Sequence, residues 1–157
     1  MNFGERPCCF VAHSSGGLIV KQILISSRLR KSSQQLADNT KLVVFYGCPN
    51  KGSKAADYSH FLQHAPEVEI AAKDIDMESK HLQWNNRLFE AIETTTMSFG
   101  ELQKTSKTLS SHFVVERNSL FDFYLDVDHS HLIKPKSEED TGYVQLVKKI
   151  NETLKSK

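Results

Sequence analysis

Several features are scarce in this sequence of 157 residues, and each scarcity excludes a class of protein. There is no long run of lysine or arginine, and 20 basic residues against 19 acidic ones leave a formal charge of +1. This balance indicates no nucleic-acid partner and no polybasic membrane patch. The three cysteines, an odd number, favour reduced thiols in an intracellular compartment over a disulfide framework. No targeting segment is recognisable, and no apolar run is long enough to span a bilayer.

What remains is the composition of an ordinary globular domain, with 39% hydrophobic and 25% charged residues. A chain of this length has room for one sizeable hydrophobic core, so we expect a single domain over residues 1–157. The sequence contains no internal repeat and no low-complexity linker that would divide it.

Apolar runs alternate with amphipathic segments along the chain. Residues 8–12 and 41–48 are almost continuously apolar, which is typical of strands buried on both faces of a parallel sheet. Shorter strands are predicted at 112–116 and 122–128. This alternation predicts an α/β fold with a mostly parallel sheet of about four strands and flanking helices.

Helices are predicted between these strands. One follows the first apolar run, and the last one begins near Ser137 with a capping-box-like sequence. Residues 54–105 are mostly polar and helical in pattern. The apolar face expected within that segment consists of Leu82, Trp84, Leu88, Phe89 and Ile92.

The short stretch after the first apolar run has the pattern of a sharp turn from a strand to a helix. Residues 12–16, Ala-His-Ser-Ser-Gly, fit the nucleophile elbow G-x-S-x-G, in which a serine occupies a sharp turn from strand to helix; alanine replaces the first glycine. The elbow would hold the Ser14 hydroxyl above the sheet as a nucleophile and direct the backbone N–H of Ser15 at the substrate oxyanion. A phosphate-binding turn or a purely structural turn is also compatible with this pattern.

A serine nucleophile needs a histidine base and a carboxylate that orients the base, and in this fold they follow in the order serine, acid, histidine. His129 lies just beyond the last predicted strand, where the base belongs, and His131 is its near competitor. Glu116 closes the preceding predicted strand and is the first candidate for the acid. The alternative acids are Asp122, Asp126 and Asp128. This chemistry needs no metal and no cofactor, and none is predicted.

Three stretches together carry a family resemblance. They are RPCCFVAHSSGGLIVKQIL from residue 6, NTKLVVFYGCPNKGSKAADYS from residue 39, and DVDHSHLIKP from residue 126, which a C-terminal helix follows. In this order they resemble the serine active site-containing protein family of lipase-like α/β hydrolases. The resemblance implies Ser14 as nucleophile and His129 as general base. It also implies serine-hydrolase chemistry linked to phosphatidylglycerol remodelling and cholesterol trafficking, where mitochondria meet the endoplasmic reticulum.

The sequence departs from the family pattern at the acid. Ungapped alignment places Arg117 where the family has its acid, and Glu116 stands one residue early. A shift of one residue turns a strand side chain to the opposite face, so Glu116 can act as the acid only if the register of this loop shifts by one residue. Asn50 and Ile133 also replace residues common in the family. Two functions therefore stay open: an ester hydrolase or acyltransferase that works through acyl-Ser14, and a catalytically silent hydrolase-like module that binds a lipid or a protein.

The resemblance also bears on domain organisation. In the α/β-hydrolase fold the elbow ends the fifth strand, but only residues 1–7 precede the first apolar run here. We therefore expect the fifth to eighth strands of a hydrolase domain whose N-terminal half is missing, with the strand at 8–12 exposed at a sheet edge. Such a chain would be weakly active or inactive alone, with a protein partner covering the edge and any membrane association supplied by the missing regions.

Overall fold

The computed structural model describes residues 4–50, 79–103 and 121–155. Four strands form one sheet in the order β1-β2-β3-β4, and every neighbouring pair is parallel. The predicted α/β class and sheet of about four strands are thereby confirmed. In chain order the elements are β1 (Cys8–His13), α1 (Gly16–Leu29), α2 (Gln34–Asn39), β2 (Thr40–Tyr46), α5 (Lys80–Glu90), β3 (Thr95–Glu101), β4 (Phe123–Leu125) and α6 (Thr141–Lys155).

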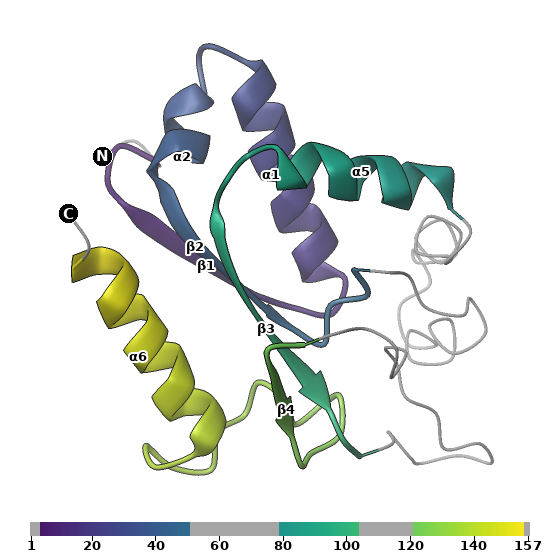
Figure 1. The fold of residues 1–157 in the computed structure, drawn as a ribbon, viewed down its shortest axis with the longest axis vertical. Coiled ribbons are helices and arrows are strands. Elements are labelled where there is room, and N and C mark those ends of the chain that lie inside the picture. The colour runs from purple at the N-terminus through teal and green to yellow at the C-terminus, as the bar shows by residue number, and fades with distance from the viewer. Residues whose placement is uncertain (1–3, 51–78, 104–120, 156–157) are drawn as a thin grey trace.

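The helices cover the two faces of this sheet in two groups. Figure 1 shows α1, α2 and α5 together on one side and α6 alone on the other. Strand β2 explains this arrangement, since successive side chains of a strand point to opposite faces. Val43 and Phe45 join the core beneath α1, whereas Leu42, Val44 and Tyr46 join the core that faces α6. None of the described helices is long and apolar enough to cross a membrane.

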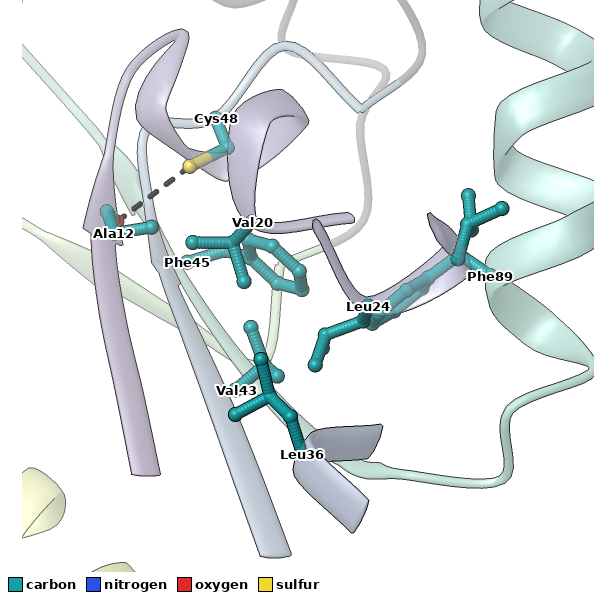
Figure 2. Packing of buried hydrophobic residues seen from close by; sticks show 9 residues of the cluster. Ala12, Val20, Leu24, Leu36, Val43, Phe45, Cys48 and Phe89 are labelled. Atoms are coloured by element: carbon teal, nitrogen blue, oxygen red, sulfur yellow. Dashed lines mark hydrogen bonds between the residues drawn. The ribbon is translucent and has the colours of Figure 1, made fainter. Parts of the chain in front are cut away.

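The core beneath α1 is closed by aromatic contacts between β2 and α5. Figure 2 shows Leu24 of α1, Phe45 of β2 and Phe89 of α5 in one cluster. The two phenylalanine rings meet edge to face, with centroids 6.0 Å apart. The Lys21 side chain is buried there; its Nζ donates to Asn86 Oδ1 at 2.7 Å and lies 5.3 Å from both ring centroids. Because desolvation disfavours the ammonium form, the pKa of Lys21 falls to about 8. This lysine therefore joins α1 to α5 at the cost of burying a charge.

Strand β3 corrects the expectation of a helical segment that reaches residue 105. Residues 95–101 form a strand paired with both β2 and β4. Three threonines, β-branched residues that favour strands, stand at 94–96, and Met97, Phe99 and Glu101 follow at alternate positions that share one face. The polar composition of the preceding residues concealed this alternation.

The other predicted elements have mixed outcomes. Helix α5 is present, with Leu82 and Phe89 buried, but Trp84 is 59% exposed and does not join the core. Strand β4 is shorter than the predicted 122–128, and helix α6 begins at Thr141, after the predicted start near Ser137. The strand predicted at 112–116 lies outside the described residues.

Among the described strands, β1 has only β2 as a neighbour and lies at an edge of the sheet, as expected from the sequence. Val11 on this strand is 53% exposed. All three cysteines are free thiols: Cys8 and Cys9 on β1 are partly buried, and Cys48 is buried. Whether a protein partner covers the β1 edge stays a prediction.

The two glycines at the start of α1 provide a matched pair for a stability test. A Cβ built on Gly17 would lie 2.8 Å from Cys48 Cβ and 2.9 Å from Phe45 Cδ1, whereas a Cβ on Gly16 would meet nothing within 4 Å. We expect Gly17→Ala to lower the free energy of unfolding by about 1–3 kcal/mol through overpacking, and Gly16→Ala to change it by no more than about 0.5 kcal/mol. Chemical denaturation measures both; equal effects would show that α1 does not depend on this close approach.

Candidate active site

The carboxyl ends of three parallel strands bring the candidate residues to one edge of the sheet. Strand β1 ends at His13, β2 at Tyr46 and β3 at Glu101. Parallel strands share their direction, so the turns that follow them lie at the same edge. Ser14 follows β1 directly, and its N–H donates to the Tyr46 carbonyl at 2.9 Å. The sheet therefore places Ser14 beside the end of β2.

Ser14 occupies a strained turn. Its φ is 55°, in the left-handed region that non-glycine residues seldom adopt. The turn is closed by the Gly17 N–H, which donates to the Ser14 carbonyl at 3.1 Å, and Ser15 is the N-cap residue of α1. A serine held at such an angle between a strand and a helix is the backbone signature of the nucleophile elbow. The sequence-predicted elbow thus has the expected backbone form.

His129 is fully buried, and its partner is Glu101. The His129 Nδ1 lies 2.8 Å from Glu101 Oε2, and the exposed fractions of the two residues are 0% and 4%. An ionised carboxylate only accepts hydrogen bonds, so Nδ1 is the nitrogen that carries the proton. The other ring nitrogen, Nε2, is then the basic one. This is how a carboxylate orients the histidine in a serine-hydrolase triad.

Gly47 makes room for the His129 ring. Its φ is 54°, and a Cβ at this position would lie 2.8 Å from both Cε1 and Nδ1 of His129. The Gly47 N–H donates to the Phe99 carbonyl at 2.8 Å, two residues before Glu101 in β3. Only glycine combines this backbone angle with this close approach. The turn after β2 therefore packs directly against the ring of His129.

Three of the four acids expected from the sequence have hydrogen-bond partners other than His129 in the described part of the chain. Glu116 lies outside the described residues. Asp122 accepts from the Ser98 N–H at 2.7 Å, and Asp126 accepts from Gln103 Nε2 at 3.1 Å.

Asp128, the last alternative acid, is paired with His131 instead. Its Oδ1 lies 2.8 Å from Nδ1 of His131, whose side chain is 64% exposed. Burial alone would raise the pKa of Asp128, but hydrogen bonds from His131 outweigh it and lower this pKa. The two histidines thus differ in kind: His129 has a buried carboxylate partner, and His131 has a partner near the surface.

Glu101 is a candidate site residue that the sequence interpretation did not name. A signal was present, because Glu101 continues the alternation of Met97 and Phe99 and ends a strand between Ser14 and His129 in the chain. This position satisfies the order serine, acid, histidine. Assigning a helix to the segment hid a carboxylate at the carboxyl end of a central strand.

Two further features delimit the site. A cavity of about 350 Å³ lies on the α6 side of the sheet, where its lining includes Val11, Tyr46 and Lys134 but neither Ser14 nor His129. Within residues 4–50, 79–103 and 121–155, no three histidine, cysteine or acidic side chains are grouped so as to hold a metal ion. The described cavity is therefore separate from the Ser14 turn.

Comparison with known proteins places this geometry in context. No protein-family model matches the chain. Over 161 residues it is 31% identical to Protein SERAC1 of Danio rerio, and over 163 residues it is 26% identical to that of Mus musculus and 24% identical to that of Homo sapiens. These alignments include 96% of this chain but only 24–25% of each relative. The chain thus spans about a quarter of the length of the curated relatives it matches.

Proposed function

We propose that this chain carries a serine-hydrolase site that hydrolyses or transfers the acyl group of a lipid-like ester. The single observation that carries the proposal is the buried 2.8 Å contact between Glu101 and His129, located at the sheet edge where Ser14 occupies its strained turn. A histidine and a carboxylate buried together cost desolvation free energy, which is characteristic of active sites. In this proposal Ser14 is the nucleophile, His129 the base and Glu101 the acid.

The proposed reaction has two steps. In the first, Ser14 Oγ bonds to the ester carbonyl carbon while its proton passes to Nε2 of His129; the carbon–oxygen bond of the ester then breaks, and the leaving alcohol takes that proton. In the second, the oxygen of water or of another alcohol bonds to the acyl carbon while its proton passes to Nε2 of His129; the bond from that carbon to Ser14 Oγ then breaks, and Ser14 takes the proton back. Water gives hydrolysis, and an acceptor alcohol gives acyl transfer. Glu101 stabilises the imidazolium that forms in each step.

The oxyanion of each tetrahedral intermediate needs hydrogen-bond donors. The proposed donor in this chain is the backbone N–H of Ser15, because the residue after the nucleophile supplies one donor in an elbow. Ser15 is also the N-cap residue of α1, and the N-terminal end of a helix carries a partial positive charge.

The lipid class of the substrate rests on similarity. The chain resembles the serine active site-containing family, and its curated relatives are SERAC1 proteins. On this basis we propose a phospholipid ester as substrate, phosphatidylglycerol in particular, and a place of action where mitochondria meet the endoplasmic reticulum. No cofactor is part of the proposed chemistry.

A fluorophosphonate probe tests the proposal most directly. The probe phosphonylates a serine only when a base activates it, so we expect covalent labelling of the wild-type protein and none of Ser14→Ala. Ser26→Ala, which removes a serine from α1 outside the turn, is the matched control and should label like the wild type. Intact-protein mass spectrometry measures the adduct. A folded wild-type protein that does not label would instead support the catalytically silent, lipid- or protein-binding module.

A further inference from the structure

We propose that His13 is a positioning residue for the base: its Nε2–H donates to the backbone carbonyl of His129 and fixes the depth and angle of the His129 ring. This inference rests on the proposed function, since it gives His129 the part of general base. It adds a residue outside the serine, histidine and carboxylate of the triad.

The geometry joins the turn before the nucleophile to the segment that carries the base. His13 is the last residue of β1 and precedes Ser14. Its Nε2 lies 2.9 Å from the His129 carbonyl oxygen, 116 residues along the chain. The two imidazole rings have centroids 4.7 Å apart and planes inclined by 38°. His13 therefore contacts both the backbone and the ring of His129.

The partner determines which nitrogen of His13 carries a proton. A carbonyl oxygen only accepts hydrogen bonds, so Nε2 of His13 must donate. The charged and titratable groups facing this ring are Glu101 on β3 and His129 and Lys134 after β4. Desolvation and then the nearby His129 lower the pKa of His13, against the opposing influence of the carbonyl contact and of Glu101. The ring is therefore neutral near pH 7.

Neutrality matters because His129 becomes a cation during each proposed reaction step. A neutral His13 supplies a donor to the backbone of His129 without placing a positive charge against the imidazolium. A protonated His13, itself half-buried, would repel the imidazolium of the fully buried His129 across 4.7 Å. Productive proton transfer thus requires both rings to be neutral before the reaction begins.

Two replacements of His13 separate its hydrogen bond from its ring. His13→Phe keeps a ring and removes the donor, whereas His13→Gln keeps an N–H donor of similar reach and removes the ring. We expect the Phe variant to lose about tenfold in the rate of fluorophosphonate labelling, as for the loss of one neutral hydrogen bond, and the Gln variant to retain most of it. A loss in the Gln variant with full labelling in the Phe variant would overturn the inference in favour of ring packing, and equal losses would overturn it because the hydrogen bond would then not decide the rate.

Proton NMR of the intact protein separates this inference from the proposed function. The His129 Nδ1 proton, held by Glu101 and assigned by its loss in His129→Ala, should exchange with solvent about tenfold faster in His13→Phe but not in His13→Gln. That pattern in a protein that never labels would refute the proposed function and support the positioning role. Normal labelling with unchanged proton exchange in His13→Phe would refute the positioning role alone.

Discussion

His129→Ala is expected to lower ester turnover by up to about 10⁶-fold, the loss on removing the base of a fully active triad, and to the uncatalysed background where this chain alone is weakly active. Without the imidazole, no group takes the proton of Ser14 as its oxygen attacks, and none returns it to the leaving alcohol. Ser14→Ala should cause a loss of the same size, and the double variant should lose no more, because triad members act as a unit. Hydrolysis of a short-chain nitrophenyl ester by the intact protein measures all three variants.

His131→Ala is the matched control for this prediction. Both histidines follow β4 and both contact a carboxylate, but the His131 side chain is 64% exposed while that of His129 is fully buried. The His131→Ala replacement should change turnover by less than about tenfold. A large loss in His131→Ala together with near wild-type turnover in His129→Ala would assign the base to His131.

The sequence predicted those parts of the fold in which local pattern and burial agree. The continuous apolar run of β2 reflects burial on both faces of the sheet, and the strand, turn and helix around Ser14 have the small residues that a tight turn requires. His129 could be named as a candidate because it follows the last strand in chain order. In each case one short segment contained the whole signal.

Glu101, the acid that we propose, could not be assigned in this way because its position depends on strand pairing. The carboxylate reaches His129 only because β3 lies beside β2 and ends at the same edge of the sheet. Reading residues 95–101 as part of a helix gave Glu101 no place at that edge. Glu116, the next carboxylate that closes an apolar run, is then the first candidate for the acid. Register between strands far apart in the chain is set by tertiary packing and leaves little trace in local sequence.

The relation between His13 and His129 was also beyond local pattern. Within the elbow, His13 occupies a variable position of the motif, where the sequence offers no reason to assign a role. Its contact with the carbonyl of His129 spans 116 residues and depends on how the segment after β4 returns to β1. Only the folded arrangement shows that the residue before Ser14 also touches His129.

Glu101→Gln is expected to lower turnover by about 10⁴-fold, as does the corresponding acid-to-amide change in a serine protease triad. The amide is nearly isosteric with the carboxylate, but it carries no charge to stabilise the imidazolium of His129. Its NH₂ group can also donate to Nδ1, which would favour the tautomer whose proton sits on Nε2 and so abolish the base. Steady-state hydrolysis measures the loss, and thermal unfolding of the same samples verifies that the variant is folded.

Asp128→Asn is the matched control, because it makes the same chemical change in a carboxylate that contacts His131 at 2.8 Å. It should leave turnover within about tenfold of the wild type, since removal of an exposed pair is a small perturbation. Glu116→Gln tests the acid first expected from the sequence. A loss of several orders of magnitude in Glu116→Gln, with a folded and active Glu101→Gln, would mean that Glu116 charges the imidazole during turnover. A large loss in Glu101→Gln with an active Glu116→Gln would instead assign the acid to Glu101. Strand β3 would then have two functions, since Met97 and Phe99 pack in the hydrophobic core and Glu101, its last residue, orients His129.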